Sequence, residues 1–393
     1  MRLARQQALA VQVFCAFANS ALSGAARCFW PRRRPLDPKR VCIYRIGNIG
    51  DTACAIPAMH AIRRAYPAAR LTLLTSPGKS GSVGARELLE GASWLDEIVV
   101  YHAEDIATAR GRRELIRKLR SHKFDAWIEL PAVAASLATQ FRNIAVARAA
   151  GVRWAFGWRY QPRFAAQAQS TFTEFPDEVE RLLALVREAG FDGTDDDFPL
   201  QISDSTSRTV SGLLDQAGVK GGGELMIALA PGAKLEPNRW PADRFIEVGK
   251  SLAARGNRIL ILGGASDAPM CDQIANAIGR NAASLAGKTT VRESCEVLAR
   301  CVMLICNDSG VQHLAAAVGT QCVSLFTRRE FPGMWWPHGP QHEVLMKDVE
   351  CHTCFLDVCP YDNKCIKAIG VDDVVAAAGR VLARQPSRKP QVA

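Results

Sequence analysis

Short apolar runs alternate with amphipathic or alanine-rich stretches along most of this chain, starting at Val41. Runs of this length bounded by polar turns are typical of buried strands, and the stretches between them are long enough for helices. The strands predicted in the first half are Val41–Tyr44, Leu71–Thr75, Glu97–Val100 and Ala126–Leu130. Helices are predicted between them, at about 52–65, 85–91 and 112–121, and a further one at about 177–189.

The second half repeats the same alternation. Its predicted strands are Leu225–Ala230, Arg258–Leu262, Val302–Cys306 and Cys322–Phe326. A helix is expected at 242–255, because Pro241 suits a helix start and Phe245, Val248 and Leu252 then share one face. Strands that alternate with helices in this way predict an α/β protein with parallel, doubly wound sheets.

A chain of 393 residues is long enough for two such domains. We place an N-terminal extension at 1–40, a first domain at 41–205, a second at 206–370, and a C-terminal helix with a tail at 371–393. The border lies in a stretch, 198–223, that contains Pro199 and a glycine-rich break. The last residues, from Gln385, are expected to be disordered.

The N-terminal extension contains an uncharged stretch from Gln6 to Ala26, which follows Arg2 and Arg5 and precedes Arg27. Its several Asn, Gln and Ser residues make it too polar for a helix that spans a membrane. The pattern fits a helix that lies in a membrane interface, or a plain surface helix.

The chain carries a net charge of +10, which favours an anionic membrane surface or phosphorylated substrates as partners. Nucleic acid is disfavoured because no basic motif with interleaved stacking aromatics is present. Most of the thirteen cysteines are scattered through apolar segments, which is typical of reduced, buried thiols in a cytoplasmic protein.

The first predicted strand leads into a polar loop that includes Arg45, Gly47, Asn48 and Gly50 and reaches Asp51 at a helix start. Glycines there allow a ligand to approach the backbone closely. The Asp51 carboxylate could accept a proton from a substrate hydroxyl, although a helix N-terminus favours its charged form and weakens it as a base. The alternative is that Asp51 only caps the helix.

Two loops of the second half offer contacts for a nucleotide. Lys234 and Arg239 flank a Pro-Gly-Ala turn and could neutralise a departing diphosphate, or they could be ordinary surface cations. Asp267 follows the next predicted strand, where an acidic residue often binds ribose hydroxyls, but it could equally cap a helix.

A later turn, Asp308-Ser309-Gly310 with His313 one helical turn on, follows another predicted strand. A polar turn that opens an alanine-rich helix presents backbone N–H groups to an anion, so a phosphate site is expected here. His313 could reach the same anion or be structural.

Four cysteines near the C-terminus, Cys351, Cys354, Cys359 and Cys365, form a dense cluster. Thiolates at this spacing could hold a structural zinc or an iron–sulfur cluster, which would leave a redox protein as one reading of the chain. Reduced cysteines in a small loop are the alternative.

Together these elements resemble glycosyltransferase family 9, the ADP-heptose:lipopolysaccharide heptosyltransferases. The resemblance rests on Gly50-Asp51 with Pro57, on the stretch from Pro231 to Pro241, on Asp308 to Ala317, and on the cysteine tail. It covers about 41–382.

The resemblance implies a GT-B fold, in which two Rossmann-like domains face a central cleft. It also implies an inverting transfer of a heptose, without a metal cofactor, from an ADP-sugar to an inner-core lipopolysaccharide sugar at the cytoplasmic surface of the inner membrane. Asp51 would be the base, and Asp308, Ser309, Gly310 and His313 would line the donor phosphate site.

One position departs from the family. A lysine often precedes its Arg-Trp pair, and this chain has Asn238 there. A non-catalytic member that only binds a nucleotide-sugar is therefore the alternative function.

Overall fold

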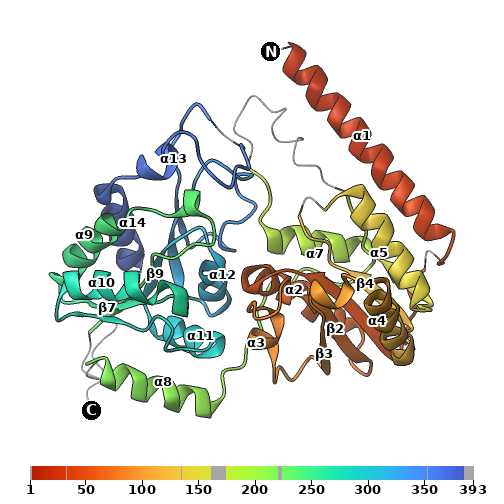
Figure 1. The fold of residues 1–393 in the computed structure, drawn as a ribbon, viewed down its shortest axis with the longest axis horizontal. Helices are drawn as coiled ribbons and strands as arrows, with labels where there is room; N and C mark the ends of the chain where they lie inside the picture. Colours follow the sequence, from red (N-terminus) through yellow and green to blue (C-terminus); the bar gives the residue numbers. More distant parts are fainter. Residues whose placement is uncertain are drawn as a thin grey trace. The chain divides into compact units, whose positions relative to one another are not determined.

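The computed structural model describes residues 2–31, 33–133, 135–160, 174–219, 224–351 and 353–384. Two compact units, Met1–Pro199 and Leu200–Ala393, divide the chain (Figure 1). The predicted border lay six residues later, after residue 205. Because the observed border follows Pro199, the whole of helix α8 (Asp204–Gln216) belongs to the second unit.

The first unit is built on a parallel sheet with the strand order β3-β2-β1-β4-β5. Its strands are β1 (Arg40–Ile46), β2 (Arg70–Ser76), β3 (Glu97–Val100), β4 (Ala126–Glu129) and β5 (Trp154–Phe156). Strand β1 is central, and Val41 pairs with Leu71 on one side and with Ala126 on the other. Five consecutive residues of β1 are buried, as expected for a parallel strand covered on both faces.

Helices cover both faces of this sheet. They are α2 (Ile49–Ala65), α3 (Ala85–Leu89), the short 3-10 helix η1 (Glu104–Ile106), α4 (Ala109–His122), α5 (Leu137–Ala149) and α7 (Glu178–Glu188). Helix α2 packs against α7 and α3. A separate core cluster joins Leu119 of α4 and Ile144 of α5 to Cys42 and Trp127 of the sheet.

The N-terminal extension forms one long helix, α1 (Arg2–Arg27), which is attached to the first unit. Leu22 is fully buried in the cluster that also contains Trp30. The Asn19 side chain exchanges two hydrogen bonds with the Tyr160 backbone, at 3.1 and 2.8 Å, and the Trp30 indole donates to the Val152 carbonyl at 2.9 Å. No helix among the described residues combines the length and apolar character needed to cross a membrane.

The second unit contains a six-stranded parallel sheet with the order β11-β10-β9-β6-β7-β8. Its strands are β6 (Met226–Ala230), β7 (Arg258–Ile261), β8 (Ala282–Ser284), β9 (Met303–Asn307), β10 (Gln321–Leu325) and β11 (Glu343–Leu345). Its other elements are η2 (Glu236–Asn238), α9 (Ala242–Ala253), η3 (Ala265–Asp267), α10 (Ala268–Ile278), α11 (Val291–Arg300), α12 (Gly310–Ala317), α13 (Lys364–Lys367) and α14 (Val371–Arg384).

Helix α9 carries its apolar face into the core as predicted, since Phe245, Val248 and Leu252 are fully buried. The C-terminal helix α14 packs on α9 and on the sheet, and its Val374 and Val381 complete the same core. Helix α14 is therefore an integral part of the second unit.

Both sheets are doubly wound, which confirms the predicted fold class. In each sheet, the order in which successive strands are added reverses between two neighbouring parallel strands, β1 and β4 in the first sheet and β6 and β9 in the second. Ligands of such sheets bind beyond the carboxyl ends of the strands at this switch point. The loops after β1, β6 and β9 are therefore where ligand contacts are expected.

A pair of phenylalanines tests the core of the first unit. Phe124 is buried in the cluster beneath α4 and α5, whereas Phe17 is 73% exposed on α1. We expect Phe124→Ala to lower the free energy of unfolding by about 3–5 kcal/mol in urea titrations of the full chain. Phe17→Ala should change it by less than about 0.5 kcal/mol. Equal effects of the two changes would contradict this placement of the core.

Candidate active site

Asp51 is the third residue of α2, directly beyond the carboxyl end of β1. Its Oδ2 atom accepts a hydrogen bond from the Asn48 backbone N–H at 3.0 Å. Asn48 occupies the capping position, and Asp51 closes the first turn from inside the helix. The side chain keeps 24% of its surface exposed, so the capping contact leaves the carboxylate accessible.

Gly47 makes room for this carboxylate. Its φ is +156°, and a Cβ atom placed there would lie 2.3 Å from the Asp51 Cβ and 2.8 Å from Oδ2. Any side chain at position 47 would displace Asp51, so the glycine is required by close packing as well as by its backbone conformation.

Arg45 differs from its predicted place in the loop. It lies within β1 and is only 1% exposed, because its guanidinium points into the protein. It donates to the carbonyl oxygens of Leu130 and Pro131, at 3.3 and 3.0 Å. It also donates to Glu178 on α7 at 2.9 Å and lies 3.4 Å from Asp51 Oδ1. Arg45 is therefore a buried residue that positions the Asp51 side chain.

Glu178 was not identified from the sequence, although it completes this arrangement. It is buried, and Arg181, one turn further along α7, donates to it at 2.6 Å. Burial opposes its ionisation, but the charges and hydrogen bonds of Arg181 and Arg45 hold its pKa below the usual value. It therefore stays ionised and balances the charges of Arg45 and Arg181.

The pKa of Asp51 is raised, chiefly by burial and further by the charge of Glu178. Arg45 and the Asn48 N–H act in the opposite direction without cancelling the effect. A carboxylate with a raised pKa is a stronger proton acceptor. The expected weakness of Asp51 at a helix N-terminus is thus offset by its surroundings.

In the second unit, Asn307 at the end of β9 organises the loop after β6. Its side-chain amide donates to the Pro231 carbonyl at 2.7 Å and its oxygen accepts from the Trp240 N–H at 3.1 Å. These two bonds hold both ends of the 231–240 loop. The sequence offered no local signal for this role, because the partners lie 76 and 67 residues away.

Asn238 joins this loop to the predicted phosphate turn. Its amide donates to Asp308 Oδ2 at 3.1 Å, and its oxygen accepts from the Thr327 hydroxyl at 3.2 Å. Gln312 on α12 donates to the other Asp308 oxygen at 3.3 Å. Asn238 is buried and contacts the same aspartate that the turn contributes. The departure from the family pattern therefore sits at the centre of the site.

Burial raises the pKa of Asp308 to about 7, and the charge of Glu330 adds to the effect. Arg329 and the hydrogen bond from Gln312 lower the pKa only in part. Near neutral pH this carboxyl group is therefore partly protonated and carries less than a full negative charge.

Ser309 precedes α12, which begins at Gly310, as the sequence predicts. The Ser309 hydroxyl donates to the Asn307 carbonyl at 3.3 Å. His313 is buried, and its ring lies edge-on to Trp335 with 6.2 Å between the centroids. The turn and its helix N-terminus are thus formed, whereas binding of an anion by Ser309, Gly310 or His313 stays a prediction.

The predicted cations lie at the surface of the same loop. Lys234 and Arg239 are exposed, and Arg239 Nε donates to the Ala233 carbonyl at 2.9 Å, which stiffens the turn. Asp267 closes η3 by accepting from the Gly264 N–H at 3.1 Å, in agreement with the capping alternative. A Cβ atom at Gly232 would lie 2.7 Å from the Asp267 carboxylate, so this aspartate also borders the 231–240 loop.

The cysteine tail does not form the predicted metal centre within the described residues. Among all the described residues, the only group whose three potential ligand atoms lie within 4.8 Å of one another is Asp195, Asp196 and Asp197, in the first unit. The tail cysteines form no such group. His352, which lies in sequence within this cysteine cluster, is outside the described residues. The tail has a structural contact instead, since Asn363 donates to Glu236 of η2 at 2.6 Å and thereby supports the 231–240 loop.

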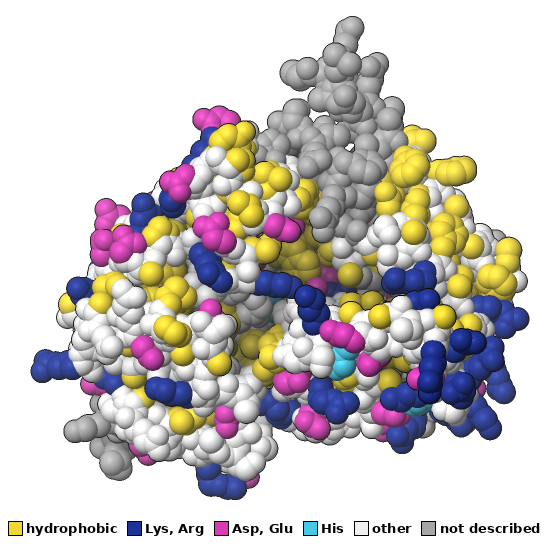
Figure 2. Space-filling view, viewed as in Figure 1, with side chains coloured by type: hydrophobic (Ala, Val, Ile, Leu, Met, Phe, Trp, Pro, Cys, Tyr) yellow, Lys and Arg dark blue, Asp and Glu magenta, His cyan; other side chains and the backbone are white. Residues whose placement is uncertain are grey.

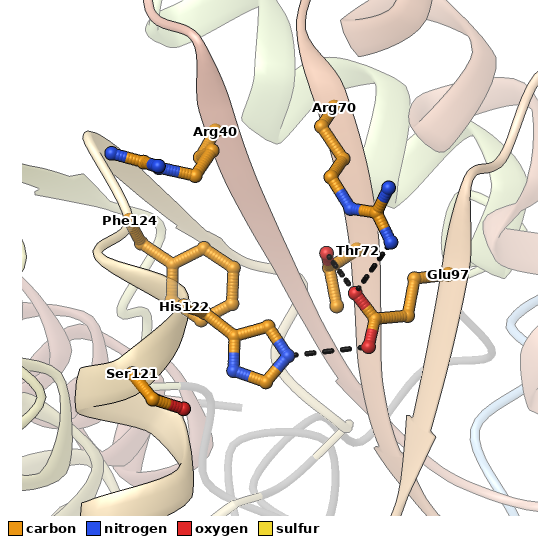
Figure 3. A pocket seen from close by; sticks show the side chains of 7 residues that line it. All are labelled: Arg40, Arg70, Thr72, Glu97, Ser121, His122 and Phe124. Atoms are coloured by element: carbon orange, nitrogen blue, oxygen red, sulfur yellow. Dashed lines mark hydrogen bonds and ion pairs between the residues drawn. The ribbon is translucent and has the colours of Figure 1, made fainter.

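A polar pocket of about 380 Å³ lies elsewhere in the first unit, at the amino-terminal edge of the sheet (Figure 3). Arg40 and Arg70 open strands β1 and β2 there, at the opposite end from Asp51. Glu97 accepts from Arg70 and Thr72 and pairs with His122 at 3.2 Å. Because these polar groups satisfy one another, the pocket is a weaker candidate than the switch points.

Solved structures establish the class of this fold. The chain superimposes on a family 9 glycosyl transferase from Veillonella parvula with a TM-score of 0.71 at 18% identity, covering 90% of this chain and all of the other. For Escherichia coli ADP-heptose lps heptosyltransferase II the TM-score is 0.62 at 20% identity, with coverage of 88% and 99%. The fold class is GT-B.

The family follows from the sequence. The model of glycosyltransferase family 9 (heptosyltransferase) matches residues 112–365, more than half of the chain, and the chain therefore belongs to this family. Lipopolysaccharide heptosyltransferase 2 of Escherichia coli strain K12 is 27% identical over 230 residues, which are 55% of this chain and 63% of that protein. The chain thus spans somewhat less than two thirds of this relative.

Asp308 can be tested through the pH dependence of stability. Its folded pKa of about 7 exceeds the ordinary value of 3.8, so the folded state binds more protons between about pH 4 and 7 and loses stability as pH rises. Relative to Asp308→Asn, the wild type should lose about 4 kcal/mol over this interval. Urea titrations at several pH values measure the difference, and a constant gap between the two proteins would refute the raised pKa.

Proposed function

We propose that the protein is an inverting glycosyltransferase that moves a heptose from ADP-heptose to an inner-core lipopolysaccharide sugar or a related glycan. The accessible Asp51 carboxylate with its raised pKa, beyond the carboxyl end of β1, carries this proposal. Family membership and the GT-B fold support the same class of reaction.

In the proposed step, Asp51 accepts the proton of an acceptor hydroxyl while that oxygen bonds to the anomeric carbon of the donor. The bond from this carbon to the ADP phosphate breaks, and ADP leaves with the electron pair. Attack opposite to the leaving group inverts the anomeric centre. The proton goes to Asp51 and the new negative charge goes to the diphosphate, so no metal is needed to balance the step.

The donor site is proposed at the carboxyl ends of β6 and β9. The first-turn N–H groups of α12 would bind the diphosphate, and Lys234 with Arg239 would offset its charge. Asp267 would bind ribose hydroxyls. Support comes from the contacts among Asn307, Asn238 and Asp308, which hold the 231–240 loop against the turn before α12.

We place the enzyme in the cytoplasm at the surface of the inner membrane, where a lipopolysaccharide-type acceptor would be available. One structural neighbour gives the donor a chemical precedent: Escherichia coli heptosyltransferase WaaC has been solved with ADP and with ADP-2-deoxy-2-fluoro heptose.

Asp51→Asn should lower kcat for heptose transfer by about 10²–10⁴-fold, because the proton acceptor is lost. In the wild type, kcat/KM should fall as pH drops through the raised pKa of Asp51, since protonation removes the base. That acidic limb should disappear in the variant. Product formation from ADP-heptose, measured by chromatography across pH, gives both results.

The matched control is Asp37→Asn, which removes an exposed carboxylate elsewhere in the first unit. Titration calorimetry should find the same ADP affinity in both variants and in the wild type. Undiminished turnover in Asp51→Asn would remove Asp51 as the base. Binding of ADP-heptose by the wild type without transfer to any acceptor would favour the non-catalytic alternative.

Lys234→Ala should weaken ADP binding about tenfold at low salt, with a smaller effect at high salt, because the lost contact is an exposed charge. Lys250→Ala on α9 removes an exposed lysine from the same unit and should leave the affinity unchanged. Titration calorimetry with ADP measures both. Equal affinities in all three proteins would place the diphosphate away from Lys234.

A further inference from the structure

Helix α1 presents an exposed apolar face. Val13, Phe14 and Phe17 are 61%, 45% and 73% exposed, whereas Ala18 and Leu22 on the opposite side are buried. The sequence has no charged residue from Gln6 to Ala26 and places Arg27 at the helix end. Large aromatic side chains that stay exposed on an uncharged helix face are suited to burial against a second apolar phase.

Helix α5 extends this face. It packs beside α1, and Phe141 on its surface is 42% exposed. Arg142 and Arg148 of the same helix are also exposed, and the Arg148 guanidinium lies 5.7 Å from the centre of the Phe29 ring. Aromatic rings and arginines thus alternate on this side of the first unit.

Helix α4 lies on the other side of α5 and is strongly basic. Its sequence holds six Arg or Lys residues and one acidic residue, Glu114, which pairs with Arg110 at 3.0 Å. Arg113 and Arg117 are exposed. Figure 2 shows the result in the first unit, where hydrophobic side chains over α1 border dark blue side chains over α4.

We define the apolar–basic face by residues of these three helices and the turn after α1: Phe14, Phe17, Phe29, Arg113, Arg117, Phe141, Arg142 and Arg148. The three helices together carry eleven Arg or Lys residues and one Glu. This charge complements a negatively charged partner, and the exposed phenylalanines require that the partner also offers an apolar interior. A bilayer with anionic lipids supplies both within one surface.

We propose that the apolar–basic face binds the surface of an anionic phospholipid bilayer. Phe14 and Phe17 enter the boundary between headgroups and acyl chains, and the arginines of α4 and α5 contact lipid phosphates. This inference builds on the proposed function by naming the surface that would hold the enzyme beside a lipid-linked acceptor.

Flotation of the full-length protein with vesicles tests the proposal. The wild type should float with vesicles of phosphatidylcholine and phosphatidylglycerol, but not with pure phosphatidylcholine, and salt should weaken binding. Arg113→Glu with Arg117→Glu should lower the partition coefficient about 25-fold or more, at about fivefold for each lost cation. Phe14→Ser with Phe17→Ser should lower it at least about tenfold.

Matched controls come from the second unit. Arg255→Glu with Arg280→Glu reverses two exposed arginines, and Val358→Ser removes an apolar side chain that is 78% exposed. Both control proteins should bind vesicles like the wild type. Equal losses in the controls, or wild-type binding that is the same on neutral and anionic vesicles, would overturn the proposal.

Two further measurements separate this proposal from others. In sedimentation velocity, the wild type and Phe17→Ser should show the same association state. Self-association of the wild type that Phe17→Ser abolishes would instead make the face an interface between copies of this chain. Transfer to a soluble, deacylated acceptor should be unchanged in the vesicle-binding variants. If transfer fails in the wild type while vesicle binding holds, the proposed reaction is wrong and the membrane surface stands.

Discussion

The buried guanidinium of Arg45 is the interaction on which the position of Asp51 in the first unit depends. A charge removed from water is tolerated only where partners surround it, and Arg45 has Glu178, Asp51 and two backbone carbonyls within reach. These partners come from α7, from the start of α2 and from the segment after β4. One side chain therefore fixes three parts of the first unit around the carboxyl end of β1. Asp51 owes its position to this network and its accessibility to the absent side chain of Gly47.

In the second unit, side-chain amides rather than a buried charge hold the loops together at the carboxyl ends of the strands. Asn307 and Asn238 each use both the donor and the acceptor of one side chain, so each can join two segments without adding charge. A lysine at position 238 would bring a cation to the turn before α12, whereas asparagine brings a hydrogen-bonded bridge to Asp308 and Thr327. Under the proposed function, neutralisation of a bound diphosphate would fall to Lys234 and Arg239, which the loop keeps at the surface.

The sequence predicted the central strands and the two-unit plan, because buried parallel strands leave continuous apolar runs. The short strands β5, β8 and β11 were missed, since three residues at a sheet edge leave no such run. Asp51, Asp308 and the loop between Pro231 and Trp240 were found from turn chemistry and family resemblance. Glu178 and the roles of Asn307 and Asn238 were not predicted, because the contacts that bring these residues to Arg45, Pro231 and Asp308 span about 70 residues or more. The burial of Arg45 could not be read locally for the same reason.

Burial raises the pKa of Asp51 in the first unit and of Asp308 in the second, but the partners of the two carboxyl groups differ. Asp51 faces a buried arginine, which offsets part of the burial effect on its pKa, and it keeps part of its surface exposed. Asp308 receives neutral amide donors and lies near Glu330, which brings its pKa to about 7. Under the proposed function, a partly protonated Asp308 repels a neighbouring diphosphate less than a full carboxylate does, and the approach of that anion would raise its pKa further. Under that function, the same residue type would serve as a base in one unit and as a neighbour of phosphate in the other.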